Sequence, residues 1–263
     1  MTKLLSSFVR LLVQAISLFL PASKRMRFRS RVYNALEPYE PVMIGGRAHR
    51  LFVPDRTSIY WILEGPDSEP VTNRWIESMA PDDVLVDVGA NVGFFSLYAA
   101  AQGVRRVMAI EPNPLSFNAL CLNIVENGYE DVIRPLNLAV LDETGWTKFA
   151  MSELKAGSVG NFVDVQQSHT GKHLGLAGVP LDFLMTHGFL EDASHLKIDV
   201  DGLDFEVLQS GAKFLERDSL KSVLIEDTGA PEQTSRRDKM MADRGFRAVD
   251  DFGAQAYYTI FTR

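Results

Sequence analysis

The chain has 263 residues, of which 46% are hydrophobic and 23% charged, and its formal net charge at pH 7 is −7. This composition is typical of a globular enzyme with a sizeable core and excludes a disordered or fibrous protein. The negative net charge argues against nucleic acid as a partner, because surfaces that bind nucleic acid are basic. The chain has a single cysteine, Cys121. This count excludes a disulfide framework and favours a reducing, cytoplasmic location.

The first 31 residues differ from everything that follows them. Polar residues recur at spacings of three and four along a mainly apolar run, which predicts an amphipathic helix with a narrow polar stripe. These polar residues are Lys3, Ser7, Arg10, Gln14 and Ser17. Pro21 ends the predicted helix, and a basic cluster follows: Lys24, Arg25, Arg27, Arg29 and Arg31.

Two interpretations of this N-terminal segment stay open. A transmembrane span needs about 20 apolar residues, but this run is shorter and contains Arg10. A secretory signal needs a small-x-small cleavage site, which does not follow the apolar run, and the basic cluster lies on the wrong side of it. The helix therefore either lies on the inner face of a membrane, with its basic neighbours near anionic lipid, or packs on the enzyme body or on a second subunit of a homo-oligomer.

The next segment is expected to form a lead-in of short strands and one helix. Gly45-Gly46 marks a turn, and His49–Val53 and Ser58–Leu63 are predicted strands. A helix is predicted to begin near Ser68, with Pro70 in its first turn. The expected division of the chain is an N-terminal extension over 1–33, the lead-in over 34–80 and the main domain over 81–263.

From residue 82 onward, predicted strands and helices alternate, which indicates a doubly wound α/β domain with a mainly parallel sheet. The predicted strands are Val84–Val88, Arg106–Ile110, Val132–Ala139, Leu196–Val200, Ser222–Glu226 and Gln255–Phe261. The predicted helices are Gly93–Ala101, Pro114–Asn127, Asp204–Glu216 and Glu232–Asp243. Residues 145–178 are rich in glycine and interrupt this alternation, so a hairpin and a mobile loop are expected there.

The strongest local signal is the run from Asp87 to Gly93, where an apolar strand enters a glycine turn and a helix begins directly afterwards. Gly89 and Gly93 permit close backbone approach and unusual dihedral angles. A ligand can then lie against the turn and the helix N-terminus at the carboxyl edge of the sheet. Glu111 ends the next strand, where its carboxylate can accept hydrogen bonds from both hydroxyls of a ribose. For the turn alone, a tight strand-to-helix connection without a ligand is the alternative.

Two classes of nucleotide cofactor use such a turn. A dinucleotide site needs the pattern G-x-G-x-x-G, which the residues after Gly89 do not supply. Asp87 lies two residues before the first glycine and suits a positively charged ligand. The sulfonium and the α-amino group of S-adenosylmethionine are both positive. The sequence therefore favours S-adenosylmethionine, and a nicotinamide-dependent oxidoreductase is the alternative enzyme class.

The order of these motifs resembles the FkbM-like family of S-adenosylmethionine-dependent methyltransferases. The matching segments lie within residues 69–250 and comprise 87–96, 110–114, 137–140, 196–208 and 223–226. The resemblance implies a class I methyltransferase fold, which is Rossmann-like with a mainly parallel seven-stranded sheet, here carrying an N-terminal helical extension. It also implies S-adenosylmethionine as the donor and, usually, O-methylation of a hydroxyl of a glycan, glycolipid or natural product.

The resemblance assigns a set of donor-site residues. Asp87, Gly89 and Asn91 are implied to line the methionine side of the donor, and Glu111 is implied to hold the ribose. The remaining expected donor contacts are Gly93, Pro112, Asn113, Asn137 and Ala139, of which the two asparagines are placed near the adenosine.

Carboxylates gather at the predicted acceptor end of the site. Asp199, Asp201 and Glu226 end adjacent strands at the ligand edge, where a base within reach of a hydroxyl assists methyl transfer. Three neighbouring carboxylates raise a proton affinity or invite a divalent cation. Lys197 shares a strand face with Asp199 and either takes part or pairs with a carboxylate. Asp199 is the preferred base and Glu226 the second choice, whereas His195 is expected to be a strand-start residue.

One departure from the family pattern concerns Asp201, which stands where the family more often has glutamate, so its reach is about one methylene shorter. The three carboxylates at the acceptor end favour an enzyme over a non-catalytic donor-binding adaptor at a membrane. The sequence does not name the acceptor.

Overall fold

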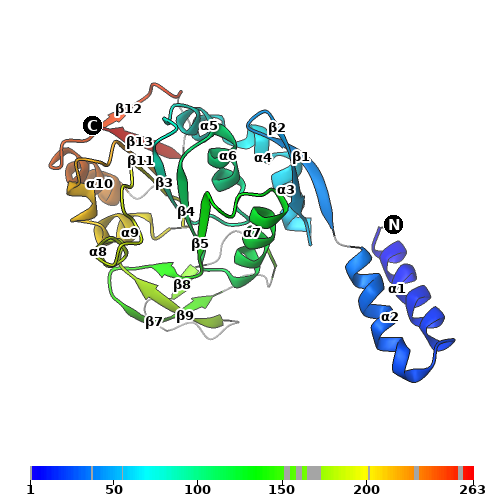
Figure 1. Ribbon diagram of the computed structural model, residues 1–263. Helices are drawn as coiled ribbons and strands as arrows, with labels where there is room; N and C mark the ends of the chain where they lie inside the picture. The colour runs from blue at the N-terminus through cyan, green and yellow to red at the C-terminus, as the bar shows by residue number, and fades with distance from the viewer. Residues whose placement is uncertain are drawn as a thin grey trace. The chain divides into compact units, whose positions relative to one another are not determined.

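The computed structural model describes residues 2–36, 38–54, 56–150, 155–157, 162–164, 173–200, 202–227, 231–253 and 257–263. The chain separates into two compact units, Met1–Tyr39 and Glu40–Arg263. Figure 1 shows the N-terminal unit as a pair of helices and the second unit as a sheet with helices packed on it.

The N-terminal unit is a helical hairpin. Helix α1 spans Thr2–Leu18 and α2 spans Ala22–Ala35, with Pro21 immediately before the first residue of α2. Proline fits this position because the first turn of a helix has no partner for the missing N–H. The basic cluster thus lies on a second helix. No helix among the described residues is long and apolar enough to cross a membrane.

The larger sheet of the second unit has seven strands among the described residues, in the order β12-β13-β11-β10-β3-β4-β5. Strand β13 runs antiparallel to both of its neighbours, and the pairs from β11 to β5 are all parallel. The expected doubly wound, mainly parallel seven-stranded sheet is therefore confirmed. The strands are β3 Val84–Val88, β4 Arg106–Ile110, β5 Ile133–Leu136, β10 His195–Ile198, β11 Ser222–Glu226, β12 Arg247–Val249 and β13 Tyr258–Thr262.

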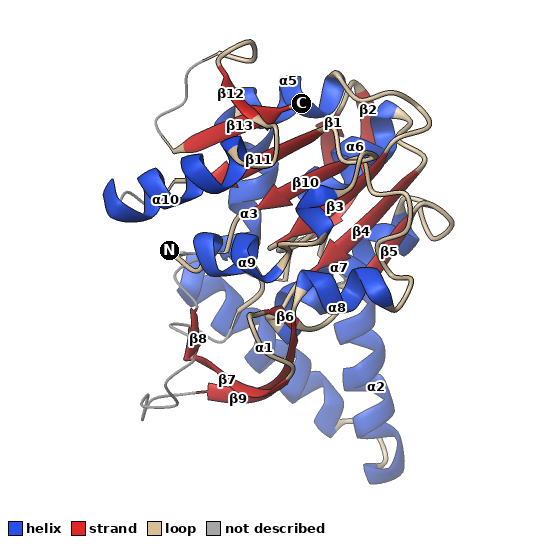
Figure 2. Ribbon diagram, turned by 90° about the vertical axis from the view of Figure 1, so that its left-hand side faces the viewer, coloured by secondary structure: helices blue, strands red, loops and turns tan. Residues whose placement is uncertain are grey.

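Helices cover both faces of this sheet, as Figure 2 shows. One face packs against α5 Pro70–Glu77, α6 Phe94–Gln102 and α7 Pro114–Glu126. The other face packs against α8 Leu181–Thr186, α9 Asp204–Ser210, the 3₁₀ turn Phe214–Glu216 and α10 Pro231–Ala242. Successive strand residues alternate between the two cores, so Leu85 joins the first and Val86 the second. The buried central strands explain the near-continuous apolar runs in the sequence.

Two smaller sheets flank this core. Strands β1 Tyr39–Ile44 and β2 Arg47–Phe52 pair around the predicted Gly45-Gly46 turn. The other sheet has the order β6-β9-β7-β8, with β7 antiparallel to β9, as the expected hairpin requires. The predicted mobile loop falls mainly on residues outside the described ones. The strands of this sheet are β6 Ala139–Val140, β7 Gly145–Ala150, β8 Phe162–Asp164 and β9 His173–Val179.

Three element predictions are wrong. The predicted strand Ser58–Leu63 lies within helix α3, Arg56–Leu63, which precedes the short helix α4, Gly65–Ser68. Ser58 is buried and its Oγ donates to the Ala156 carbonyl at 3.3 Å, so a tertiary contact overrides the β-branched and aromatic composition.

The other two predicted elements are interrupted. The predicted strand Val132–Ala139 divides into β5 and β6, which belong to different sheets. The predicted helix Asp204–Glu216 ends at Ser210, before Gly211. A Cβ at Gly211 would lie 3.0 Å from the Leu181 side chain, so glycine lets the chain pass close to α8 here.

Candidate active site

Four parallel strands bring the predicted site residues to one edge of the sheet. Strands β3, β4, β10 and β11 all run in the same direction, so the residues at their carboxyl ends gather there. In the register of β10 and β3, Lys197 lies directly opposite Asp87. Asp199 follows β10, and its N–H donates to the Val88 carbonyl at 3.1 Å.

The glycine turn is shaped by contacts within the protein. Gly89 has φ +86°, and a Cβ there would lie 1.8 Å from the Asp199 carbonyl oxygen. Gly93 has φ +90°, and a Cβ there would lie 2.5 Å from the Leu120 side chain. Both positions therefore need glycine for backbone conformation and for packing. These two glycines fit the tight strand-to-helix connection without any ligand.

Asn91 is the residue of the turn that this connection does not explain. Its backbone has φ +52°, which is uncommon for a residue other than glycine. Its side-chain Oδ1 is buried, and no donor among the described residues reaches it. A buried acceptor without a partner is costly, so this atom marks a place where a ligand could supply a donor.

Glu111 holds the turn and the next loop together. Its Oε2 accepts a hydrogen bond from the Asn91 N–H at 2.8 Å, and its Oε1 accepts one from the Asn113 N–H at 2.7 Å. The carboxylate is thus fixed at the sheet edge after β4, where the sequence places it. A carboxylate oxygen can accept more than one hydrogen bond, so these amide contacts do not exclude a hydrogen bond from a ribose hydroxyl.

The two asparagines expected near the adenosine also fix the backbone of this loop. Asn137 donates from Nδ2 to the carbonyls of Glu111 at 2.8 Å and Pro112 at 3.2 Å. Asn113 caps α7, because its Oδ1 accepts from the Leu115 N–H at 3.0 Å. Ala139 is buried in β6. The donor contacts expected of these residues stay predictions.

A buried lysine connects the two ends of the site. The side chain of Lys197 is 1% exposed, and its Nζ lies 2.7 Å from Asp199 Oδ2 and 3.7 Å from Asp87 Oδ1. Burial alone would lower the pKa of Lys197, but Asp199, Asp87 and Glu69 outweigh it and hold this pKa above its usual value. Lys197 therefore stays charged, acts as a counter-ion and cannot serve as a base.

Asp87 lies beneath the glycine turn. It is fully buried and accepts a hydrogen bond from the Ser96 hydroxyl at 2.6 Å. Burial raises the pKa of Asp87, while Lys197 and Ser96 act in the opposite direction. The sequence predicts that the charge of Asp87 attracts a cationic donor. In the structure Lys197 lies 3.7 Å from Asp87 and opposes this charge, so the attraction of Asp87 for a donor is weaker than that of an unpaired carboxylate.

Glu69 and Tyr258 are site residues that the sequence analysis missed. Glu69 stands directly before α5, is largely buried, and accepts hydrogen bonds from Thr72 at 3.0 Å and from Tyr258. Tyr258 pairs with Glu226 in the register of β11 and β13. No local motif marks either residue, because the tertiary fold brings α5 and the last strand to this edge.

Burial is the largest influence on the pKa values of Glu69 and Tyr258. It raises the pKa of Glu69, and the charge of Asp199 adds to the effect, whereas Lys197 lowers this pKa. It also raises the pKa of Tyr258, assisted by Asp199, Glu69 and Glu226. The Tyr258 hydroxyl therefore keeps its proton at neutral pH and acts as a hydrogen-bond donor.

Asp204 shapes the loop that carries Asp199. Its carboxylate accepts hydrogen bonds from the N–H groups of Val200 at 3.0 Å and Gly202 at 3.1 Å. Asp201, the fourth predicted catalytic residue, lies outside the described residues. Burial raises the pKa of Asp204 to about 6, although the two amide hydrogen bonds act against this shift.

This pKa predicts a pH effect on stability. A raised pKa in the folded state means that protonation favours folding. The contribution is complete below the unfolded pKa of about 3.9 and is lost as pH rises through about 6. The Tm of the wild type is therefore expected to rise relative to that of Asp204→Asn as pH falls from 7 to 5. Thermal melting measures this, with Asp218→Asn as an exposed control; parallel pH curves for wild type and Asp204→Asn would contradict it.

The predicted divalent cation has no support here. The described residues contain no group of three or more histidine, cysteine, aspartate or glutamate side chains that could hold a metal ion.

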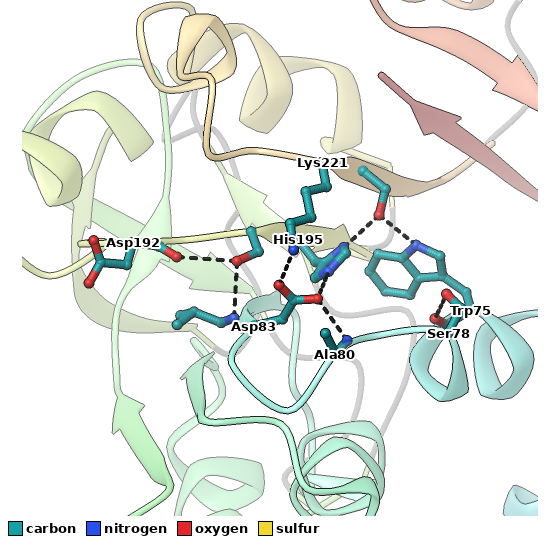
Figure 3. A network of polar contacts seen from close by, with 10 residues as sticks. Trp75, Ser78, Ala80, Asp83, Asp192, His195 and Lys221 are labelled. Atoms are coloured by element: carbon teal, nitrogen blue, oxygen red, sulfur yellow. Dashed lines mark hydrogen bonds and ion pairs between the residues drawn. The ribbon is translucent and has the colours of Figure 1, made fainter.

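His195 lies at the opposite, amino end of β10, within the network of polar contacts that Figure 3 shows. Its ring nitrogens lie 2.9 Å from Asp83 Oδ2 and 2.7 Å from Ser222 Oγ. Ser222 also accepts a hydrogen bond from the Trp75 indole N–H at 2.8 Å and is buried. Lys221 contacts the same Asp83 carboxylate. This network joins α5 to β10, to β11 and to Asp83 directly before β3, so His195 is the strand-start residue that the sequence predicts.

The strand order, the glycine turn after β3 and the acid after β4 define a Rossmann-like domain of the class I methyltransferase type. The chain belongs to the FkbM methyltransferase family: the family's methyltransferase FkbM domain matches residues 87–248. This membership confirms the family predicted from the sequence motifs and displaces the nicotinamide-dependent oxidoreductase.

Two curated proteins show the range of related chains. The chain is 28% identical over 183 residues to the hexuronic acid methyltransferase AglP of Haloferax volcanii, covering 70% of this chain and 72% of AglP. It is 33% identical over 84 residues to a tRNA(Phe) (4-demethylwyosine(37)-C(7)) aminocarboxypropyltransferase of Pyrococcus horikoshii. That match covers 32% of this chain and 30% of the relative.

Solved structures with a similar fold include the methyltransferase FkbM of Methylobacillus flagellatus KT, with 12% identity and a TM-score of 0.49. The match covers 79% of this chain, which spans about half, 54%, of that structure. TYW2 of M. jannaschii, solved in complex with AdoMet, has 17% identity and a TM-score of 0.47, over 86% of this chain and 87% of that one.

Proposed function

We propose that this protein transfers a methyl group from S-adenosylmethionine to a hydroxyl oxygen of a sugar-containing acceptor. The observation that carries the proposal is the contact between Gly89 and the Asp199 carbonyl. It joins the predicted donor turn directly to the loop that carries the predicted acceptor-side carboxylate. Methyl transfer needs donor and acceptor side by side, so this contact suits the reaction.

The residues of the donor end fit S-adenosylmethionine. Glu111 stands directly after β4, where the family resemblance places the ribose, and Asn91 offers a buried acceptor without a partner among the described residues. When bound, this donor supplies a methyl group on a positively charged sulfur. The carboxylate of Asp87 beneath the turn, although it is paired with Lys197, favours a cationic ligand over the phosphates of a dinucleotide.

The acceptor end suits a neutral hydroxyl better than a carboxylate. Lys197, the basic side chain that contacts Asp199, is buried and faces Asp87, Asp199 and Glu69. The carboxylate of an acidic acceptor brought to this edge would be repelled by the three carboxylates that surround Lys197. In this proposal, Asp199 accepts the proton that a hydroxyl loses as its oxygen bonds to the methyl carbon, and Lys197 holds that carboxylate in position.

The relative AglP is named as a hexuronic acid methyltransferase, which supports a sugar as the acceptor class. A screen with labelled S-adenosylmethionine against matched hexose glycosides and hexuronic acids tests the proposal. Methyl ethers on hydroxyls, which survive mild alkali, are the expected product. Methyl esters, which mild alkali cleaves, would show that a carboxylate is the acceptor. A chelator added to the same assay is expected to leave turnover unchanged.

The donor site predicts the effect of Glu111→Ala. This substitution removes the ribose acceptor, and a hydrogen bond to a charged group contributes about 1.5–3 kcal/mol, so the Kd for S-adenosylmethionine is expected to rise at least about tenfold. Titration calorimetry measures this, with the exposed Glu216→Ala as a matched control. Equal affinity in both variants, or tighter binding of NAD than of S-adenosylmethionine by the wild type, would remove the donor assignment. A melting curve separates lost binding from lost folding, because Glu111 also holds two backbone amides.

A further inference from the structure

The outward surface of α1 is apolar. Along Thr2–Leu18 the polar residues fall on one narrow stripe, and the large apolar side chains occupy the rest of the helix. Leu4 is 77% exposed and Phe8 62% exposed, and Phe19 just beyond the helix is 90% exposed. The other exposed large apolar residues of this segment are Leu5, Val9, Leu11, Leu12, Ile16 and Leu18.

The contact between α1 and α2 includes Ser17 of the polar stripe. Arg29 donates from Nε and Nη2 to the buried Ser17 hydroxyl at 3.0 and 2.8 Å. Arg25 donates to the carbonyls of Leu20 and Leu18 at 3.0 and 3.2 Å, which caps the C-terminal end of α1. Arg25 and Arg29 of the basic cluster therefore hold the two helices together, while the apolar side chains of α1 stay exposed.

The other three cations form a second stripe. Lys24, Arg27 and Arg31 are spaced by three and four residues, so they share one face of α2, and all three are exposed. Residues 1–36 contain seven of the chain's 27 basic residues and none of its 34 acidic ones. The rest of the chain then carries 20 basic and 34 acidic residues. The net charge of residues 1–36 is therefore positive, and the net charge of the rest of the chain is strongly negative.

We infer that residues 2–36, the N-terminal hairpin, bind the surface of an anionic lipid bilayer. A bilayer surface offers an apolar layer for α1 and, next to it, negative headgroups for the stripe on α2. A second copy of the hairpin would cover the apolar face but bring the same positive charge with it. The acidic remainder of the chain is repelled by such a surface, which leaves the hairpin as the part that adsorbs. This inference does not depend on the acceptor proposed above.

Flotation of the full chain with lipid vesicles tests this inference. The wild type is expected to float with vesicles of phosphatidylcholine and phosphatidylglycerol, less with phosphatidylcholine alone, and less at high salt. Replacing Lys24, Arg27 and Arg31 together by glutamine removes about 1 kcal/mol of attraction per residue, so partitioning falls about a hundredfold. A matched variant with Arg134, Lys213 and Arg247 replaced by glutamine loses the same charge elsewhere and is expected to float like the wild type.

A second pair of variants tests the apolar face at equal charge. Leu12→Glu places a carboxylate on the apolar face and is expected to abolish flotation, whereas Gln14→Glu places it on the polar stripe and weakens flotation only slightly. Affinity for S-adenosylmethionine and the melting temperature are followed in every variant to confirm folding. Failure of the wild type to float, or equal flotation of both glutamate variants, would overturn the inference. A dimer that Leu12→Glu dissociates would assign the face to a second copy and overturn it as well.

Discussion

Asp199→Asn is expected to lower turnover by about 10²–10⁴-fold, the range that general-base catalysis contributes, and to leave the Kd for S-adenosylmethionine within about threefold. The substitution keeps the shape of the side chain, but an amide cannot accept the proton that the acceptor hydroxyl loses. The donor contacts expected of Asn91 and Glu111 do not involve the Asp199 carboxylate, which pairs with Lys197. Single-turnover kinetics and calorimetry measure the two quantities separately.

Asp218→Asn is the matched control, since Asp218 is exposed in the loop before β11, and it is expected to match the wild type in both measurements. If Asp199→Asn instead loses donor binding while turnover at saturating donor is kept, Asp199 belongs to the donor site. If neither quantity changes, the base is another residue. Glu226 is then the next to test, followed by Asp201.

Lys197→Met is expected to lower the free energy of unfolding by about 3–5 kcal/mol, the usual cost of removing one partner from a buried charge network. Methionine fills a similar volume, so the loss reflects charge rather than a cavity. Without the ammonium, the buried carboxylate of Asp87 and the partly buried carboxylates of Asp199 and Glu69 repel one another. Denaturant unfolding measures the change.

A second substitution makes this prediction specific. Adding Asp87→Asn to Lys197→Met removes one of the uncompensated charges and is expected to restore part of the lost stability, whereas Asp218→Asn added to Lys197→Met restores none. A double variant no more stable than Lys197→Met would contradict the charge explanation.

The pH dependence follows from the same charges. Lys197 lowers the pKa of both Asp87 and Glu69, so these pKa values rise further in Lys197→Met. A group whose pKa is raised by folding stabilises the fold at low pH and loses that contribution as pH increases. The stability of Lys197→Met is therefore expected to recover as pH falls from 8 to 5, by more than that of the wild type. The same unfolding series at several pH values measures this.

Local patterns predicted much of the fold. Buried apolar runs place β3, β4 and β11 with the bounds that the structure has, because both faces of these strands are covered by helices. Capping and turn residues place α6 and α7 to within a residue. The carboxyl-edge placement of Asp87, Glu111, Asp199 and Glu226 follows from parallel strands alone.

Other features depend on contacts that no local pattern contains. The helix α3 forms where composition favours a strand, because Ser58 is buried against Ala156. The role of Lys197 depends on its register with Asp87, and sequence spacing does not specify which residues of two strands lie opposite. Glu69 and Tyr258 meet only because α5 and β13 reach the same edge.

The sequence by itself determined the family, the order of the elements, the place of the glycine turn and the segregation of positive charge into the first 36 residues. These properties are local, because each depends on residue types at short spacing. The tertiary structure alone decided that Gly89 packs on the Asp199 carbonyl, that Lys197 is the buried counter-ion of several carboxylates, and that the apolar side chains of α1 are exposed. Each of these depends on which distant segments meet, and the energies of burial and charge that select those contacts are summed over the whole fold.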